Sequence, residues 1–298
     1  MPEGPELRIM SDFINEKVGH RSVAKVEKSP LYKKECDFSR LQGKEWNIKS
    51  VPRGKEMILV FSHVDQQTGE KEEHYLKLGF GKIGSIVLYD LDHGDELFDR
   101  RAMLRLYFSD KILVLSDYTR LSIWRWAPGW DPYRSPDIVT QHNDWRDYLY
   151  RNRNHKHFKK PIFSIMTDQR FFNGLGNITR SEILARMRFS PFTPFVEVLE
   201  SDLMRTEFFQ TSRDVLIELY NLGGFQSKYW KNPYGKLDKK FHNWVRCYNK
   251  PLNAYFIKDE NKGKFWFSKK WSLDYAKWVD DHDVQDTTLQ KKIYSKNK

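Results

Sequence analysis

The sequence has few cysteines and no long apolar run, and each shortage excludes a class of protein. Cys36 and Cys247 are the two cysteines among 298 residues, so the chain can build neither a disulfide framework nor a zinc site of four thiolates. No stretch approaches the roughly 18 uninterrupted apolar residues of a membrane span, and the charged opening residues do not form a signal peptide. We expect a soluble, intracellular protein from a reducing compartment, with no membrane-spanning segment.

Internal repeats and low-complexity tracts are also missing from the sequence, while apolar and aromatic residues are plentiful. Hydrophobic residues make up 39% of the chain and aromatic residues 15%, which is typical of a folded protein. A chain of this length is long enough for two domains with cores of their own.

Positive charge exceeds negative charge, and the excess is concentrated in the last quarter of the chain. The formal net charge is +11, and residues 225–298 contain 17 basic and 8 acidic residues interleaved with tryptophan and tyrosine. Such a segment suits a phosphate backbone and unstacked bases. Acidic proteins and membranes are other possible partners, and for the final KKIYSKNK a solvated, disordered tail is the simpler interpretation.

The hydrophobic pattern changes twice along the chain and predicts an α+β protein. An amphipathic helix is expected at 6–18, followed by short β-rich runs that predict an antiparallel sandwich or barrel. This gives a first domain at 1–127, and the proline-rich APGWDPYRSPD begins an interdomain linker at 128–145. Helical patterns then indicate a domain at 146–240, and alternating aromatic residues indicate a β-hairpin and basic tail at 241–298.

The opening MPEGPE is a candidate catalytic site. If Met1 is trimmed, Pro2 carries a free α-amine, which titrates near 8 instead of the ~10.4 of a lysine and is a better nucleophile at neutral pH. Glu3 and Glu6 are carboxyl groups tethered within its reach. The simpler alternative is that both glutamates only stabilise the start of a helix.

A second candidate site lies in DQRFFNGLGNITRSEILARM. Gly174 and Gly176 permit tight turns, and Asn177 begins the next helix, where backbone N–H groups point outward and can bind a phosphate. The GLG motif alone is a weak signal, because an ordinary helical corner with an asparagine cap looks similar.

MPEGPEL, the lysine of PRGKE and QRFFNGLGNITRSEIL together resemble the Fpg/Nei family of DNA glycosylases, the formamidopyrimidine glycosylase and endonuclease VIII group. The FFNGLGN motif and the cysteine-poor C-terminal segment are most similar to the zincless-finger Nei-like branch of the family, which includes vertebrate and giant-virus enzymes. The resemblance implies an N-terminal antiparallel β-sandwich with an N-terminal helix, a helix–two-turn–helix domain and a zincless β-hairpin finger.

The resemblance also implies an activity and a site. The protein would be a bifunctional DNA glycosylase and apurinic/apyrimidinic (AP) lyase of base excision repair, removing oxidised pyrimidines, formamidopyrimidines and hydantoins. Pro2 would attack the sugar C1′ and form a Schiff base that permits β,δ-elimination. Glu3 would protonate the ring oxygen, Glu6 would organise the site, and Lys55 and Asn177 would hold phosphates.

Further implications concern partners, cofactors and compartment. No metal and no other cofactor is expected. The partner would be damaged DNA, double- or single-stranded, and not a membrane. A monomer would bind the DNA in the nucleus or cytoplasm according to the host. The alternative is a catalytically inactive protein of the same fold that binds damaged or structured DNA.

The sequence departs from the family pattern in the finger and in two loops of the first domain. The finger reads NKGKFWF, so Lys264 or Lys262 replaces the usual phosphate-binding arginine, without its bidentate fork. LGFGKIG suggests Phe80 as a side chain that fills the void left by a flipped nucleotide. DYTRLS stands at the place of the family's DxRRFG loop, and the resemblance then suggests Arg120 as a DNA contact and Leu121 as a second void-filling residue.

Overall fold

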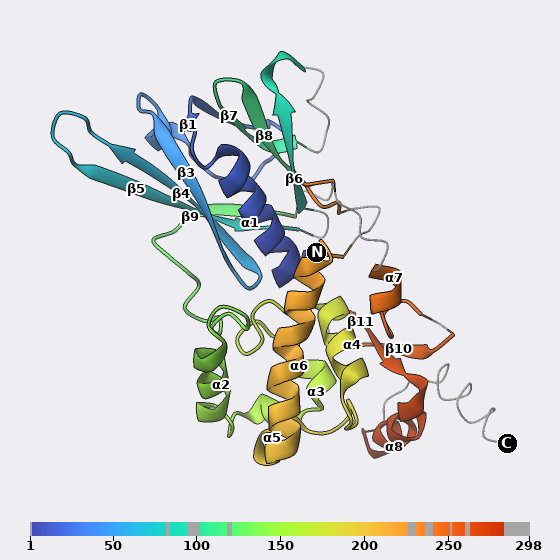
Figure 1. Ribbon diagram of the computed structural model, residues 1–298. Helices are drawn as coiled ribbons and strands as arrows, with labels where there is room; N and C mark the ends of the chain where they lie inside the picture. Colours follow the sequence, from blue (N-terminus) through green and yellow to red (C-terminus); the bar gives the residue numbers. More distant parts are fainter. Residues whose placement is uncertain are drawn as a thin grey trace. The chain divides into compact units, whose positions relative to one another are not determined.

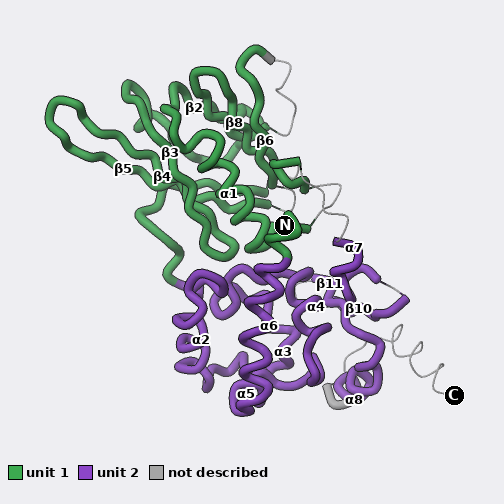
Figure 2. Tube along the Cα trace, in the orientation of Figure 1, with its two compact units in different colours: residues 1–132, 219–238 green, residues 133–218, 239–298 purple. Residues whose placement is uncertain are grey.

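The computed structural model describes residues 2–81, 84–93, 102–117, 121–225, 230–235, 241–250, 252–259 and 263–282. The chain divides into two compact units (Figure 2). The first comprises residues 1–132 and 219–238, and the second comprises residues 133–218 and 239–298. Each unit therefore takes its residues from two separate parts of the chain.

The first unit contains a long helix and two antiparallel sheets (Figure 1). Its helices are α1 (Gly4–Val18), η1 (Ser39–Leu41) and η2 (Leu91–His93). The five-stranded sheet has the order β1-β3-β4-β5-β9 and the four-stranded sheet the order β2-β7-β8-β6. The strands are β1 (Ser22–Val23), β2 (Lys25–Lys28), β3 (Trp46–Arg53), β4 (Glu56–Val64), β5 (Lys71–Gly79), β6 (Gly84–Asp90), β7 (Ala102–Tyr107), β8 (Lys111–Asp117) and β9 (Ile123–Trp126).

One core holds the first unit together. Its buried side chains come from both sheets, for example Ile48 of β3 and Leu113 of β8, and from the apolar face of α1, which packs on β3 and β4. Alternation along β3, where Trp46, Ile48 and Ser50 face inward, gives the period of two that a half-buried strand requires. Two sheets that share one core form a sandwich, as the sequence predicts.

The second unit is mostly helical and carries one β-hairpin (Figure 1). Its helices are α2 (His142–Arg151), η4 (Lys156–Lys159), α3 (Ile162–Ile165), α4 (Asn177–Arg186), α5 (Phe195–Glu200), α6 (Asp202–Asn221, whose last residues count with the first unit), α7 (Phe241–Trp244), η5 (Lys269–Trp271) and α8 (Ser272–His282). The hairpin pairs β10 (Ala254–Lys258) with β11 (Lys264–Ser268).

Aromatic rings fill the core of the second unit. Trp145 is fully buried, contacts Phe208 and Phe209, and donates its indole N–H to the Phe171 carbonyl at 2.8 Å. Phe265 of β11 stacks on Phe163, so the hairpin packs on the same core. Aromatic burial of this kind contributes both area and edge-to-face contacts.

The α+β prediction is confirmed, although the observed units differ from the predicted ranges in two places. Helix α2 begins at His142, inside the stretch predicted as a linker at 128–145. Residues 219–238 belong to the first unit, although the pattern placed them with the helices. In the described part of the chain, no helix is both long and apolar enough to cross a membrane.

Candidate catalytic and nucleic-acid site

Pro2, Glu3 and Glu6 lie together at the start of α1, where all three are buried. Glu3 is the residue that caps the helix, in an extended conformation, and Pro5 lies in the first turn, where its missing N–H costs nothing. The backbone N–H of Glu3 donates to Glu6 Oε2 at 2.7 Å, which is one half of a capping box. The capping interaction at the start of α1 therefore holds Glu3 and Glu6 close together, directly after Pro2.

Glu6 has a second backbone partner, supplied from more than two hundred residues away. The N–H of Phe225 donates to Glu6 Oε1 at 2.7 Å. Gly224, with φ +80°, precedes it, and a Cβ there would lie 3.1 Å from Glu6 Cγ and 2.8 Å from the Trp230 ring. Only glycine suits this approach, because its φ is left-handed and the space is already filled.

The pKa of Glu6 is raised from 4.5 to about 7, first by burial and second by the neighbouring Glu3 carboxylate, against the lowering effect of the N–H groups of Phe225 and Glu3. A carboxyl group with such a pKa exchanges a proton readily at neutral pH. The start of α1 thus combines a candidate nucleophile with a proton-exchanging acid.

Lys55 lies in the two-residue turn between β3 and β4, where Arg53 pairs with Glu56. Gly54 precedes it with φ +55°, a conformation that glycine adopts without steric cost. Glu56 in turn lies 3.4 Å from the ammonium of Lys77 in a buried ion pair. The tight turn fixes Lys55 at one end of the hairpin, in the same unit as Pro2.

The two loops suggested for void filling differ in exposure. Phe80 is 9% exposed and packs in the core, and a Cβ on Gly84 would lie 2.3 Å from its ring. Leu121 is 55% exposed. Phe80 thus does not project into solvent, whereas Leu121 does, and Arg120 lies outside the described residues.

The buried hydroxyl group of Ser122 connects the backbone at the start of the first loop with the end of β8, before the second loop. Ser122 donates its Oγ–H to Asp117 Oδ2 at 2.6 Å and accepts the N–H of Gly81 at 3.0 Å. The same Asp117 oxygen accepts the backbone N–H of Ser122 at 2.6 Å. Leu121 is therefore exposed next to a rigid anchor.

The helix corner predicted around Gly174, Gly176 and Asn177 is present in the second unit. Gly174 has φ +113°, and Gly176 is the extended residue that precedes α4. The N–H of Gly176 donates to Thr179 Oγ1 at 2.9 Å, which fixes the start of the helix. Asn177 is the first residue of α4.

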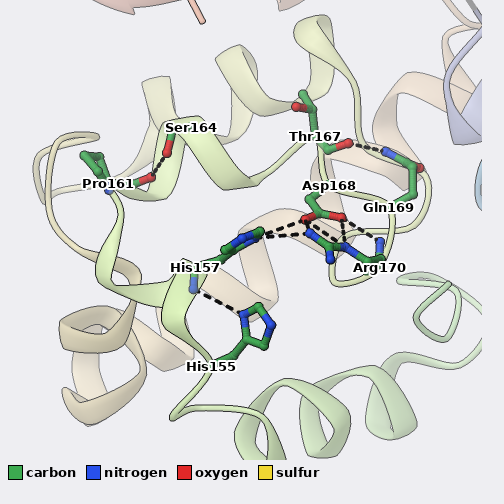
Figure 3. A network of polar contacts seen from close by, with 8 residues as sticks. All are labelled: His155, His157, Pro161, Ser164, Thr167, Asp168, Gln169 and Arg170. Carbon is green, nitrogen blue, oxygen red and sulfur yellow. Dashed lines mark hydrogen bonds and ion pairs between the residues drawn. The ribbon is translucent and has the colours of Figure 1, made fainter. Parts of the chain in front are cut away.

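The segment before this corner contains a network of polar contacts, part of which includes Thr167, Asp168, Gln169 and Arg170 (Figure 3). Gln169 donates through Nε2 to the carbonyls of Thr167 and Leu175, at 2.8 and 2.9 Å, and accepts the N–H of Gly174 at 3.0 Å. Beside it, Arg170 forms a fork to Asp168, with the shortest contact at 2.6 Å. Gln169 therefore holds both sides of the glycine turn.

Two charged residues of α4 that the sequence did not single out are fully buried. Glu182 accepts three consecutive backbone N–H groups, from Arg246, Cys247 and Tyr248, at 2.7–3.0 Å. Arg180 forms an ion pair with Asp259 at 2.6 Å. The sequence NITRSEIL shows the two charges but not their burial, and a buried charge needs a partner.

The β10–β11 hairpin carries the finger lysine. Lys264 opens β11 opposite Lys258, and its ammonium lies 4.6 Å from the centre of the Phe256 ring. Lys262 lies outside the described residues. Among the residues that the structure describes, no group of three or more histidine, cysteine, aspartate and glutamate side chains could hold a metal ion.

Comparison with known proteins identifies the chain's relatives. No family model matches it. It is 31% identical to Endonuclease 8-like 1 of Homo sapiens over 292 residues, covering 90% of this chain and 72% of the relative. It is 26% identical to the formamidopyrimidine-DNA glycosylase of Mycoplasmopsis pulmonis over 265 residues, covering 84% and 87% of the two chains.

Solved structures give the same answer for the fold. The structure of Lactococcus lactis Fpg (MutM) in a complex with DNA containing an oxidised pyrimidine matches with a TM-score of 0.70 at 19% identity, covering 90% of this chain and 98% of that one. The sandwich with its N-terminal helix, followed by the helical unit, thus has the fold of Fpg. The chain belongs to the Fpg/Nei family.

Proposed function

We propose that this chain removes oxidised bases from DNA by covalent catalysis at the amine of Pro2. As a family member it is a DNA glycosylase with AP lyase activity that acts in base excision repair on damaged DNA. The observation that carries the proposal is the buried group of Pro2, Glu3 and Glu6 at the start of α1. Because Pro2 must have a free amine, the initiator methionine has to be removed.

The proposed reaction begins with attack of the Pro2 nitrogen on the sugar C1′. A nitrogen–carbon bond forms, the ring opens as Glu3 protonates its oxygen, and the base leaves with the electrons of its glycosidic bond. The resulting iminium withdraws electrons from the sugar, so the 2′ proton is lost and the two flanking phosphates are eliminated in turn. Glu6, with a pKa near 7, exchanges the protons that these steps release and consume.

We assign the DNA contacts to both units. In the second unit, Asn177 and the Gly174–Gly176 turn bind a phosphate, and Lys264 supplies a finger cation. In the first unit, Lys55 binds a phosphate beside the reacting sugar, and Leu121 fills the space of the flipped nucleotide. Because phosphate contacts dominate affinity, binding should weaken steeply between about 50 and 200 mM salt, and a flat response would contradict the assignment.

Base flipping explains the proposed lesions. The C1′ atom of a stacked nucleotide is shielded, and a damaged base costs less to extrude. The resemblance to the Fpg/Nei family, whose members include a formamidopyrimidine-DNA glycosylase and an Fpg solved with oxidised-pyrimidine DNA, leads us to propose oxidised pyrimidines, formamidopyrimidines and hydantoins as substrates. The enzyme would act wherever its host keeps DNA, in the nucleus or the cytoplasm.

The decisive test is borohydride trapping on an oligonucleotide with one abasic site, with mass spectrometry to locate the adduct. The native-start protein should give a covalent complex at Pro2. The matched control is the same protein with an added N-terminal residue, which blocks the amine and should abolish trapping while DNA binding persists. If the native-start protein gives no adduct yet binds DNA, the chain is a DNA-binding protein of the same fold without lyase activity.

A further inference from the structure

Arg180 of α4 makes contacts that connect the start of the helix with the end of the hairpin. Its Nη2 atom donates to Asn177 Oδ1 at 2.9 Å and to Asp259 Oδ2 at 2.6 Å. Its Nη1 atom donates to the carbonyl of Phe163 at 2.9 Å. The side chain is fully buried, and the guanidinium lies over the Phe265 ring.

Asp259 fixes the end of the hairpin against the same place. Its backbone N–H donates to the Gly263 carbonyl at 2.9 Å, and its Oδ1 accepts the N–H of Gly263 at 2.7 Å. A Cβ at Gly263 would lie 2.9 Å from Asn177 Oδ1 and 3.1 Å from Nδ2. The backbone of the hairpin therefore passes directly over the amide of Asn177.

These contacts determine which way the Asn177 amide faces. A guanidinium has donors and no acceptor, so the amide atom that faces it must be the oxygen. The NH2 group of Asn177 then points to the other side, as a donor. A phosphate oxygen can only accept a hydrogen bond, so this orientation is the one that phosphate binding needs.

We infer that Arg180 is a positioning residue for DNA binding: with Asp259 it orients the Asn177 amide and sets the hairpin beside it. The inference rests on the proposed phosphate contact of Asn177, and it assigns no contact between Arg180 and DNA. Burying two charges is costly unless they are paired and further hydrogen-bonded, and here the Arg180–Asp259 pair joins the two elements that carry Asn177 and Lys264. A purely structural role for Arg180 is the competing explanation.

The test is a double-mutant cycle between Arg180→Lys and Asn177→Ala. The measured quantity is the dissociation constant for a duplex with one tetrahydrofuran abasic analogue, which the enzyme cannot open through C1′ attack. Lysine keeps the charge but cannot reach all three partners. Arg186→Lys is the matched control, because Arg186 lies on the same helix and pairs with Glu218 instead.

If Arg180 acts through Asn177, Arg180→Lys should weaken binding on the order of tenfold, the loss of one charge-assisted hydrogen bond. The same change should have less than a twofold effect in the Asn177→Ala background, and Arg186→Lys should have less than a twofold effect in either. Equal losses in both backgrounds, or no loss in either, would overturn the inference.

Folding is checked by circular dichroism. If Arg180→Lys does not fold, Asp259→Asn takes its place in the same cycle, since it removes the anchor and keeps the guanidinium. Because binding is measured on an analogue that undergoes no chemistry, the cycle gives an answer whether or not trapping at Pro2 succeeds.

Discussion

The stability of the first unit should fall as the pH rises through neutrality, because Glu6 is buried. Its pKa of about 7, against 4.5 in the unfolded chain, means that the folded state holds a proton that the unfolded state releases. One pKa unit is worth about 1.36 kcal/mol, so protonation stabilises the fold by about 3 kcal/mol below pH 4.5. This contribution is lost as the pH passes 7, with about 2–3 kcal/mol of the change between pH 5 and 8.

The measurement is urea denaturation of the wild type and of Glu6→Gln across that range. Glutamine does not titrate, so the free-energy difference between the two proteins should shift by about 2–3 kcal/mol in favour of the variant between pH 5 and 8. Glu45→Gln is the matched control, since Glu45 is exposed and its carboxylate stays hydrated on folding. A difference that does not change with pH would refute the burial argument.

Three other predictions follow from the structure. Gly224→Ala should destabilise the protein by about 1–3 kcal/mol more than Gly43→Ala, because both glycines have left-handed φ but a Cβ meets the Trp230 ring only at Gly224; equal losses of melting temperature would contradict this. Glu182→Ala should cost about 3 kcal/mol or more, since three N–H groups lose their acceptor, and a loss below about 1 kcal/mol by denaturation would refute that role. Treatment with a metal chelator should change neither the melting temperature nor trapping at Pro2, and loss of either would show that a metal is needed.

Local patterns were enough to predict much of the fold. The apolar spacing of residues 6–18 predicted α1, which is observed as Gly4–Val18. The polar stretch HVDQQTGEKEEH contains the β4–β5 hairpin connection at residues 65–70, flanked by the ends of the two strands. Gly223 and Gly224 end α6 by donating their N–H groups to the carbonyls of Tyr220 and Leu219. Each of these features depends on residues close together in the sequence.

Features that depend on distant partners could not be predicted in this way. Glu182 finds its three N–H donors more than sixty residues later, and no local period records that pairing. LGFGKIG suggests Phe80 as a void-filling residue, and in this structure its side chain is buried in the core of the first unit, a position that a single aromatic residue between glycines does not reveal. The partners of Glu6 and Arg180 are likewise set by tertiary contacts.

The division of the first unit between two stretches of chain affects when that unit can be completed during synthesis. Residues 1–132 emerge from the ribosome well before residues 219–238, and domains fold as units as they emerge. Until the second stretch appears, Glu6 lacks the Phe225 N–H and the core lacks Trp230. The candidate catalytic end of the protein, although made first, is therefore completed only after most of the second unit has been synthesised.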